Sequence, residues 1–573
     1  MKKRTFIGLA VAAGAGLALD FWPRKTLAQS KIKPQSITTT CVNLAPLGFW
    51  GNCDPFINRL KRASRWWHQY GVTEDRYTDL RTRQIKGLPA GEVLHNLINV
   101  QDVGGEFDFT EQRAGKHVLV WDGPLSVGVF GDRVDAGRTV YPNRFEFEIP
   151  PTIGAYYANP AMNLQVVNST GQPQDLNKPA LFHAADEADY LAGKRYQRNF
   201  INAFCGASIV RTMDWNLCPQ GGVDAYGKVV VETVEPANYY DSGCYTYFTS
   251  DSNEYFFPPE EIGYLAKEAN VSIFNTMSAR SSDATFAYWA NEFLKGAGHW
   301  TGELLSELGD ENWNRAWPWV AGSNYLIDKV SPGIKIVDRD GKPSSNPVDA
   351  MGCATASRSL AMWHAMERVI PRTRHKRVLA GQFMAGAGNN GMGGMLAYVD
   401  PVTRKTAGKL ADYYAVAPYW SGRLNGDTLT LATILQNRLW GDDAFWIDRC
   451  KKQIDSMHEP LKWNKDMLAK YAPNLRLTCY EGGGWLWEEA RPQKGNPLYD
   501  AGKEFDNFCR GFMDGEPGKV VMRYYWDTFI NGNFAHYNQF YHNGYNYGVQ
   551  PGLANSQVRA DTPRQALFRT LGK

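Results

Sequence analysis

Two glutamates follow apolar segments of the sequence and are themselves followed by residues that suit ligand binding. Glu311 comes after the apolar segment Glu303–Leu308 and just before Trp313. Glu481 comes after Leu475–Tyr480 and before three glycines, which let a bulky ligand approach the backbone. Glycoside cleavage needs such a pair, because one carboxylic acid protonates the leaving oxygen while a second carboxylate attacks the anomeric carbon or activates water. A helix N-cap or a surface charge is the alternative interpretation of either residue alone.

The elements that must position these glutamates are short apolar segments with the length of buried strands. Helical patterns lie between most of them, which is typical of βαβ units and a parallel sheet. The predicted strands are Cys41–Ala45, Ser208–Met213, Val271–Asn275, Glu303–Leu308, Arg377–Gln382, Tyr413–Pro418, Leu475–Tyr480 and Val520–Trp526.

Helix signals separate these strands. Pro259–Ala269 carries apolar residues at helical spacing, a second helix begins at the capping residue Asp283, and a third spans Ser357–Ile370 and stops before Pro371, which cannot continue a helix. A further helix should follow the first strand, with Asp54 as its cap and an apolar stripe at Phe56, Leu60, Ala63 and Trp67.

Eight strand-then-helix units predict an α/β fold of the (β/α)₈ TIM-barrel type, with a doubly wound open sheet as the alternative. In such a barrel, side chains at the carboxyl ends of different strands converge on one site. The barrel therefore brings Glu311 and Glu481 to the same face.

One region interrupts the alternation of strands and helices. Between residues 100 and 175 the apolar period is close to two, as in His117–Trp121, Val127–Phe130 and Arg144–Ile149. This period predicts a small antiparallel β-domain, residues 100–175, inserted after the first barrel unit. The first barrel strand and helix then occupy 29–99, and the remainder of the catalytic barrel occupies 176–573.

The N-terminus has the three parts of an export signal. Lys2, Lys3 and Arg4 precede the apolar stretch Phe6–Leu19, and Thr26–Ala28 supplies small residues for cleavage. We predict a signal peptide over residues 1–28 and a periplasmic or secreted protein; an uncleaved anchor is the alternative. No later apolar stretch reaches 18 residues, so we expect no membrane association after cleavage.

The composition excludes some partners. Lys and Arg number 62 and Asp and Glu 59, a balance that disfavours nucleic-acid binding. Aromatic residues make up 13% of the chain, with 19 Trp, enough to fill a core and still line a binding surface. We expect a monomer whose partner is a poly- or oligosaccharide.

Motifs for bound metals and cofactors are weak. The sequence has no CxxC pair and no HExxH segment, so we expect no cofactor and no metal. Gly386–Gly391 fits the dinucleotide-binding pattern GxGxxG, but the glycines that continue it make a poor helix start. Nine cysteines suggest one or two disulfides, because Cys41 and Cys53 flank a short loop and Cys205, Cys218 and Cys244 cluster.

Several segments resemble those of the clan A glycoside hydrolases, the retaining (β/α)₈ enzymes that include many cellulases and mannanases. Asp310–Asn314 resembles the Asn-Glu-x-Trp-Asn segment that follows the fourth strand in that clan, and Tyr480–Gly483 resembles its nucleophile segment after the seventh strand. Ala417–Trp420 is similar to a sixth-strand end. Arg211–Trp215 and Gly115–Gly123 are similar to segments of uncharacterised bacterial barrel proteins.

The resemblance implies that Glu311 is the acid/base and Glu481 the nucleophile. Arg211 would support the nucleophile. Tyr419 would contact the nucleophile or the sugar. Asp310 replaces the clan's Asn, which normally binds the sugar 2-hydroxyl, and an ionised Asp offers only acceptors. It also adds a negative charge beside the acid/base, which would raise that residue's pKa.

Aromatic residues near both glutamates would line the sugar groove. The resemblance places Trp526 at the end of the last strand as a platform under the sugar. Trp313, Trp420 and Trp485 offer flat apolar faces to sugar C–H groups, with core packing as the alternative for each.

These observations predict a retaining β-glycoside hydrolase that acts on a poly- or oligosaccharide by a two-carboxylate double displacement. One alternative is a catalytically weak carbohydrate-binding protein on a glycosidase-like barrel, suggested by Asp310 and the inserted β-domain. Another is a different chemistry on the same fold, since one fold hosts many functions.

Overall fold

The computed structural model describes most of the chain outside its N-terminal region. The described residues are 38–44, 55–62, 79, 81–82, 84–99, 115–130, 135–149, 161–218, 222–223, 228–244, 247, 255–316, 318–386, 391–424, 426–487, 492–540 and 562–573. The predicted signal peptide, residues 1–28, lies outside them, as do Cys53, Asp54, Ala63 and Trp67.

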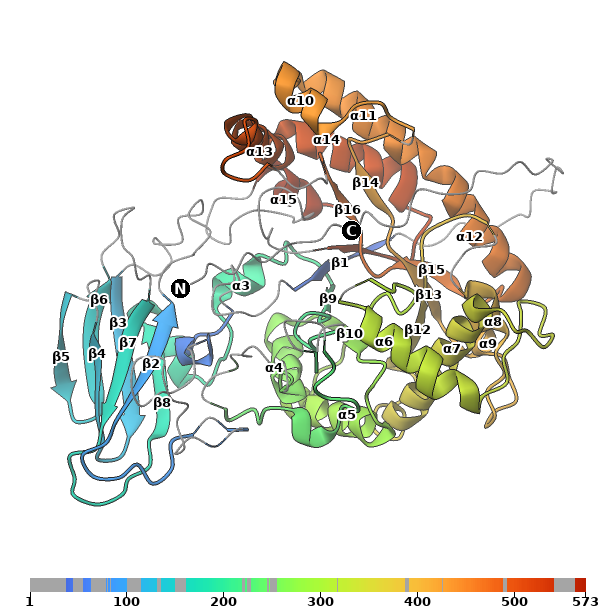
Figure 1. Cartoon of the computed structure of the whole chain (residues 1–573). Helices are drawn as coiled ribbons and strands as arrows, with labels where there is room; N and C mark the ends of the chain where they lie inside the picture. Colours follow the sequence, from blue (N-terminus) through green and yellow to red (C-terminus); the bar gives the residue numbers. More distant parts are fainter. Residues whose placement is uncertain are drawn as a thin grey trace.

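Eight parallel strands form one sheet with the order β15-β13-β12-β11-β10-β9-β1-β17 (Figure 1). In chain order these strands are β1 (Thr39–Asn43), β9 (Ile209–Arg211), β10 (Ser272–Met277), β11 (Leu304–Leu308), β12 (His375–Ala380), β13 (Tyr413–Val416), β15 (Arg476–Cys479) and β17 (His536–Gln539).

The two outer strands of this sheet meet and close it into a barrel. The Ala535 N–H, beside β17, donates to the Leu477 carbonyl of β15 over 2.7 Å. The Thr478 hydroxyl also lies 3.1 Å from His536 Nδ1 across the same seam. The predicted (β/α)₈ barrel is therefore confirmed.

The barrel strands are buried on both faces, as expected for a parallel sheet covered by helices. Alternate residues point into the barrel, where strands from around the whole sheet contribute to one interior cluster. Its buried members are Cys41, Ile209, Phe274, Leu305, Val378, Tyr413, Ala415, Tyr480 and Ala535. The intervening residues, such as Ile273 and Leu304, pack outward in the larger core under the helices.

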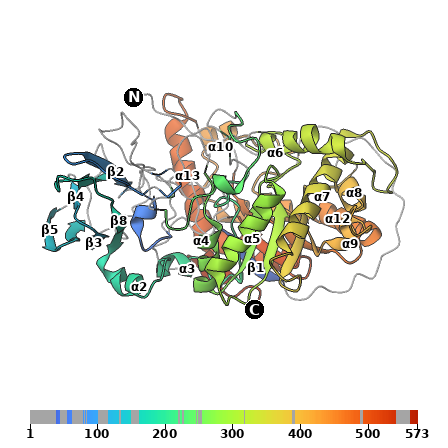
Figure 2. The same ribbon diagram turned by 90° about the horizontal axis from the view of Figure 1, so that it is seen from below.

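Helices cover the outside of the barrel (Figure 2). They include α4 (Pro259–Ala269), α5 (Asp283–Ala297), α7 (Pro347–Met366), α11 (Asp443–Ser456), α12 (His458–Tyr471), α13 (Tyr499–Asp514) and α14 (Glu516–Tyr525). The predicted helix Pro259–Ala269 coincides with α4, and the cap of α5 is Ser282, whose side chain accepts from Thr285 N–H. No helix among the described residues is long and apolar enough to span a membrane.

Two sequence predictions differ from the structure. The segment Val520–Trp526 is not the last strand. Val520–Tyr525 lies in α14, where Gly518, Val521, Met522 and Tyr525 form a buried face at helical spacing, and Trp526 begins the helical turn that follows. The actual last strand, His536–Gln539, is fully buried although it is polar, so its hydropathy gives no strand signal. After the first strand, the described residues show only a short 3₁₀ helix, Arg59–Arg62.

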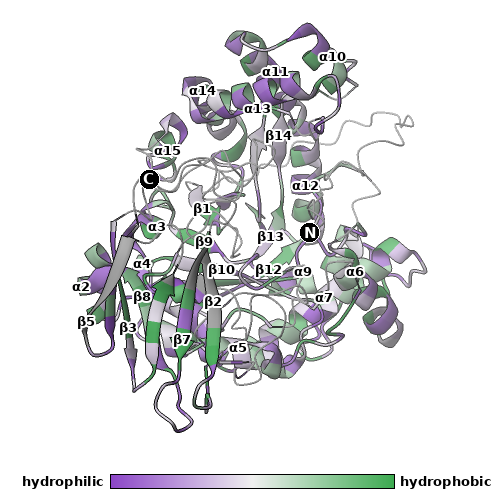
Figure 3. Cartoon of the chain, turned by 60° about the vertical axis from the view of Figure 1, so that its left-hand side comes forward, coloured by the Kyte–Doolittle hydropathy of each residue, from purple (hydrophilic) through white to green (hydrophobic). Residues whose placement is uncertain are grey.

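Two small antiparallel sheets stand beside the barrel (Figure 3). One has the order β2-β7-β4 and the other β5-β6-β3-β8. Their strands are β2 (Val93–Asn99), β3 (Gly115–Asp122), β4 (Ser126–Phe130), β5 (Asp135–Tyr141), β6 (Arg144–Ile149), β7 (Ala161–Val167) and β8 (Asn177–His183). The extra antiparallel β-domain after the first barrel strand is thus present, and the domain boundaries themselves stay predictions.

The β-domain has a core of its own and is tied to the chain after β1. Leu94, Leu119, Val127 and Leu164 belong to a cluster separate from the barrel's. The Asn58 amide donates to the Pro179 carbonyl and its oxygen accepts from Leu181 N–H, which fixes β8 to the segment between barrel strands.

The disulfide expectation is not met where the structure tests it. Cys41 and Cys218 are buried free thiols. Cys41 lies inside the barrel among apolar neighbours, and burial raises its thiol pKa well above the ordinary value, which keeps it unreactive.

The close crossing of α4 and α5 generates a stability prediction. A Cβ at Gly296 would lie 1.9 Å from the Glu260 carbonyl oxygen, and one at Gly263 would lie 2.1 Å from the Phe293 oxygen. We expect Gly296→Ala to lower the free energy of unfolding by about 1–3 kcal/mol through overpacking, measured by urea denaturation.

A matched glycine in a helix supplies the control. Gly511 in α13 has no atom within 4 Å of a built Cβ, so Gly511→Ala should stabilise the chain by about 0.5–1 kcal/mol through backbone entropy and helix propensity. Equal effects of the two substitutions would contradict the close helix approach.

Candidate active site

A buried arginine lies at the centre of the predicted site residues. Arg211, the last residue of β9, is fully buried. Its Nη1 donates to Glu481 Oε1 over 2.7 Å, and its Nη2 donates to Glu307 Oε2 over 2.9 Å and to Asp310 Oδ1 over 3.0 Å. Burial alone would lower the pKa of Arg211, but the three carboxylates outweigh it and raise that pKa well above its ordinary value.

Glu481 follows the seventh barrel strand and is oriented by two donors. Besides Arg211, the Tyr419 hydroxyl donates to Glu481 Oε2 over 2.6 Å. Burial, followed by the charge of Asp310, raises the pKa of Glu481. Burial and the nearby charge of Glu481 also raise the pKa of Tyr419, so this hydroxyl stays protonated and remains a donor.

The pairing of two short strands brings Tyr419 to Glu481. Beyond the barrel, β14 (Tyr419–Ser421) pairs in parallel with β16 (Gly483–Trp485) and continues the sixth and seventh strands. A Cβ at Gly484 would lie 2.1 Å from the Trp420 ring, so this pairing requires glycine there. The glycine run after Glu481 therefore has a packing role.

Glu311 follows the fourth barrel strand and has weaker partners than Glu481. The Asn314 amide donates to Glu311 Oε2 over 2.9 Å, and the Tyr480 hydroxyl donates to Oε1 over 3.3 Å. Burial, followed by the charge of Asp310, raises the pKa of Glu311 to about 8. Its charge in turn raises the pKa of Glu481, so the two carboxyl groups share one site.

The backbone at Glu311 is strained. Its φ is +46°, a left-handed conformation that costs a non-glycine residue about 1–3 kcal/mol and is concentrated at functional sites. Gly309, with a φ of +66°, begins the turn that leads the chain out of β11. The turn aims two successive acids, Asp310 and Glu311, into one cluster.

Asp310 is held by donors at both carboxylate oxygens. Arg211 donates to Oδ1, and the Trp319 indole N–H donates to Oδ2 over 2.8 Å. Trp319 precedes the short helix α6 (Val320–Tyr325), so Asp310 connects that helix to the arginine. Asp310, which stands where the resembled segment has Asn, therefore accepts hydrogen bonds at both oxygens of its carboxylate.

Glu307 is a site residue that the sequence analysis missed. It lies in β11, accepts from Arg211, and has 0% exposure. Its Oε1 is buried without a hydrogen-bond partner, and burial raises its pKa to about 7. The available signal was the only charged residue within the strand Leu304–Leu308, since a buried acid needs a partner.

Three of the predicted tryptophans differ in exposure. Trp313 and Trp485 are half-buried, and the Trp485 ring centroid lies 5.2 Å from that of Tyr419. Trp420 is only 2% exposed and belongs to the core.

Trp526 does not lie where the sequence analysis placed it. It follows α14 in a helical turn, Trp526–Ile530, and is 5% exposed. Its ring packs on Tyr537, with centroids 6.1 Å apart. The placement of Trp526 at the end of the last strand is therefore wrong, because its segment is helical, and its contact with the sugar stays a prediction.

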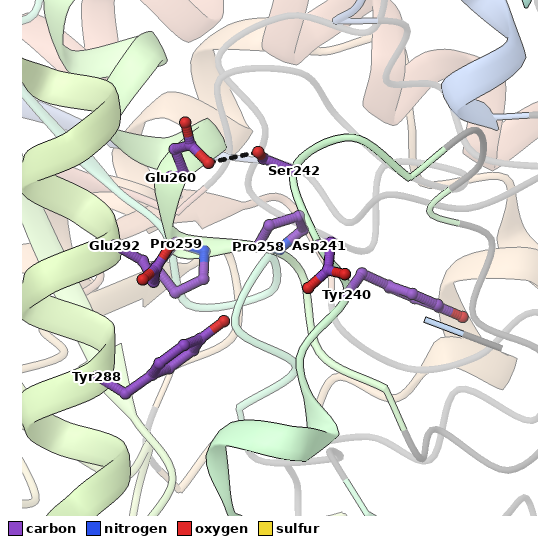
Figure 4. A pocket seen from close by; sticks show the side chains of 8 residues that line it. All are labelled: Tyr240, Asp241, Ser242, Pro258, Pro259, Glu260, Tyr288 and Glu292. Atoms are coloured by element: carbon purple, nitrogen blue, oxygen red, sulfur yellow. Dashed lines mark hydrogen bonds between the residues drawn. The ribbon is translucent and has the colours of Figure 1, made fainter. Parts of the chain in front are cut away.

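No group of three or more metal-binding side chains occurs within the described ranges. A separate small pocket lies outside the barrel, between α4, α5 and the preceding loop (Figure 4). It contains none of the predicted site residues. Its lining residues are Tyr240, Asp241, Ser242, Pro258, Pro259, Glu260, Tyr288 and Glu292.

Comparisons with known proteins find fold-level similarity alone. No protein-family model matches the chain, and no curated protein matches it. Among solved structures, a GH51 arabinofuranosidase from Xanthomonas axonopodis pv. citri aligns with a TM-score of 0.36 and 13% identity over 65% of this chain. A family 51 α-L-arabinofuranosidase from Bifidobacterium longum aligns with a TM-score of 0.34 and 12% identity over 66% of it.

The chain covers 66% of each arabinofuranosidase, just under two thirds. Thermotoga maritima Cel5A in complex with a mannotriose substrate aligns with a TM-score of 0.29 and 8% identity over 65% of this chain and 89% of that one. These neighbours are glycoside hydrolases at very low similarity.

The raised pKa of Glu311 predicts a pH-dependent stability difference. Its pKa is about 8 in the folded chain against an ordinary 4.5, so its contribution to stability is full below about pH 4.5 and is lost as the pH rises towards 8. Glu311→Gln removes this loss. We expect the variant to gain stability relative to the unsubstituted chain between about pH 5 and 8, by about 1.4 kcal/mol for each pKa unit removed.

The measurement is urea denaturation at several pH values. The control is Glu504→Gln, since Glu504 is 46% exposed in its ion pair with Arg438. If Glu311→Gln and the control follow the same pH dependence, Glu311 does not hold a proton in the folded chain.

Proposed function

We propose that this chain is a retaining β-glycoside hydrolase that acts on a poly- or oligosaccharide by double displacement. The observation that carries the proposal is the shared cluster of Glu311 and Glu481, which follow the fourth and seventh barrel strands and are linked through Arg211 and its neighbours. Two carboxyl groups at the carboxyl-terminal face of a barrel are the minimum that this reaction requires.

The hydrogen bonds support different charge states for the two glutamates. Glu481 receives two strong donors, the arginine at 2.7 Å and the Tyr419 hydroxyl at 2.6 Å, which favour the carboxylate. Glu311 receives only an amide and a 3.3 Å hydroxyl contact. One proton held by the pair therefore resides on Glu311, and neutral Glu311 no longer opposes ionisation of Glu481.

This charge assignment gives each residue a role. Glu481 attacks the anomeric carbon while Glu311 donates its proton to the leaving oxygen, which forms a covalent glycosyl-enzyme. Glu311, now a carboxylate, then takes a proton from water, and the resulting nucleophile releases the sugar from Glu481. Arg211 and Tyr419 stabilise the Glu481 carboxylate when it is regenerated as the leaving group.

The surroundings suit a sugar. Half-buried Trp313 and Trp485 offer ring faces to sugar C–H groups, and Asp310 and Asn314 offer polar atoms to hydroxyls. We further propose that the signal peptide is removed after Ala28 and that the enzyme acts as a periplasmic or secreted monomer without a cofactor.

The nucleophile assignment predicts the effect of Glu481→Gln. We expect turnover of aryl β-glycosides to fall by about a thousandfold or more, because the amide cannot form the glycosyl-enzyme. The screen covers β-1,3-, β-1,4- and mannan-type substrates, with Glu504→Gln as the control. A 2-deoxy-2-fluoro glycoside should label Glu481, identified by peptide mass spectrometry. Activity near that of the unsubstituted chain in Glu481→Gln would refute the assignment.

The acid assignment predicts a pH profile. With the pKa of Glu311 at about 8, kcat/KM should decline as the pH rises above about 8, because the proton donor is lost. In Glu311→Gln this decline should disappear. The same variant should retain more activity on substrates with dinitrophenolate leaving groups, which leave without protonation, than on ordinary glycosides.

Sugar binding without product, in a fully folded chain, would instead support the catalytically weak carbohydrate-binding protein.

A further inference from the structure

We propose that Glu307 is a positioning residue for the nucleophile: it holds one end of the Arg211 guanidinium, which keeps the other end on Glu481. The inference rests on the proposed function, since it concerns the same site. It adds to that function a residue that is sealed inside the barrel, with 0% exposure, and that acts through the arginine alone.

Each terminal nitrogen of Arg211 has two acceptors. Nη1 donates to Glu481 Oε1 over 2.7 Å and to Met213 Sδ over 3.3 Å. Nη2 donates to Glu307 Oε2 over 2.9 Å and to Asp310 Oδ1 over 3.0 Å. Because the guanidinium is a rigid plane, the acceptors that fix Nη2 also fix the direction of Nη1. The contacts at one end therefore determine whether the other end meets the nucleophile.

Aromatic rings restrict the guanidinium further. The Arg211 Cζ lies 5.4 Å from the centroid of the Phe274 ring and 5.1 Å from that of the Tyr480 ring. Rings at this distance attract the cation and obstruct a tilt towards them. The main remaining movement is a shift within the guanidinium plane, which the hydrogen bonds at Nη2 oppose.

Of the two acceptors at Nη2, Glu307 is the one held by a strand. It lies in β11, opposite Thr276 of β10 and Val378 of β12. Asp310 lies in the turn after that strand, next to the strained backbone of Glu311. A group on a strand is positioned more precisely than one on a loop. Glu307 therefore supplies the fixed contact for the arginine.

Glu307 holds the arginine as a hydrogen-bond acceptor rather than as a charge. Its Oε1 is buried without a hydrogen-bond partner, so a carboxylate would leave a charged oxygen there uncompensated. Burial raises the pKa of Glu307 to about 7, and the group is therefore neutral below that pH. Neutral Glu307 still accepts through Oε2, and it leaves the charge of Arg211 to Asp310 and Glu481.

The titratable groups that face Glu307 support this charge state. They are Arg211 of β9, Cys218 after that strand, Asp310 of the turn after β11, and Tyr480 after β15. Burial raises the pKa of the Cys218 thiol and of the Tyr480 hydroxyl well above their ordinary values, so both stay protonated. Arg211 and Asp310 already form an ion pair with each other, which reduces the pull of the arginine on a third charge.

Two conservative substitutions separate reach from charge. Glu307→Gln keeps an acceptor of the same reach without a charge, whereas Glu307→Asp keeps the acid but is one methylene shorter and withdraws the acceptor from Nη2. At about pH 6 we expect Glu307→Gln to keep kcat/KM for an aryl β-glycoside within about twofold of the unsubstituted chain. We expect kcat of Glu307→Asp to fall by about tenfold to a hundredfold with little change in KM, because a misplaced arginine affects the transition state.

A buried acid elsewhere in the chain supplies the matched control. Glu261 in α4 is also 0% exposed, pairs with Arg195, and has a buried Oε2 without a hydrogen-bond partner. Glu261→Gln and Glu261→Asp should change the melting temperature but leave kcat and KM as they are. A loss in Glu307→Gln as large as that in Glu307→Asp, or no loss in either, overturns the inference.

A measurement without substrate separates this inference from the proposed function. The ¹³C chemical shift of the Glu481 carboxyl carbon, assigned by its absence in Glu481→Gln, reports the ionisation of that group. In Glu307→Asp the midpoint of its titration should rise by about one pH unit or more, because the carboxylate loses its arginine partner. Glu307→Gln should leave the midpoint unchanged. This pattern in a chain without turnover refutes only the proposed function, whereas an unchanged midpoint in folded Glu307→Asp refutes the role of Glu307.

A third variant, Glu307→Leu, keeps the test decisive if Glu307→Asp does not fold. Leucine removes the acceptor and adds no polar group, and Arg211 keeps its ion pairs with Asp310 and Glu481, so no buried charge is left unpaired. We expect the same loss of kcat and the same rise of the Glu481 midpoint as in Glu307→Asp. A folded Glu307→Leu with both quantities unchanged overturns the proposal.

Discussion

One guanidinium organises the candidate active site. Arg211 is sealed inside the barrel, and its two terminal nitrogens bind three carboxylates from β11, the turn after it and the segment after β15. Each carboxylate costs free energy to bury unless it is paired. Removal of Arg211 would therefore leave several buried carboxylates without a cation.

The same constraint explains the local structure on either side of the arginine. The strained backbone at Glu311, with its φ of +46°, is tolerated because the turn must deliver two adjacent acids, Asp310 to the arginine and Glu311 to the Tyr480 hydroxyl. The glycines after Glu481 let β14 and β16 pair closely, which brings the Tyr419 hydroxyl to the nucleophile. Local strain and close packing are thus consequences of one electrostatic requirement.

The sequence predicted the barrel well where strands are apolar and poorly where they are polar. Leu304–Leu308 and Tyr413–Val416 are buried strands, and their mainly apolar residues indicate a strand from the sequence. His536–Gln539 is equally buried, but its polar side chains find hydrogen-bond partners within the barrel: the Asn538 amide donates to the Tyr480 carbonyl and to Asn43 Oδ1. Such partners come from strands far away in the chain, so a local pattern cannot reveal them.

The residues of the candidate site were also predictable only in part. Glu311, Glu481 and Arg211 could be found because they follow or end apolar strands beside recognisable segments. The sequence shows Glu307 only as a charged residue within a strand. Its contact with Arg211, and that of the Trp319 indole with Asp310, depend on the fold and could not be predicted. The position of Trp526 was predicted wrongly for a related reason: a mainly apolar segment of seven residues is compatible with a buried helix face as well as with a strand.

The neighbours of β1 have a consequence for synthesis. This strand pairs with β9 on one side and with β17, almost five hundred residues later, on the other. Until the ribosome has released His536–Gln539, a nascent chain contains at most seven of the barrel strands. Their sheet then has two unpaired edges, which can pair with strands of other polypeptides. Ring closure therefore has to wait until β17 has been synthesised, and the barrel sheet stays open until then.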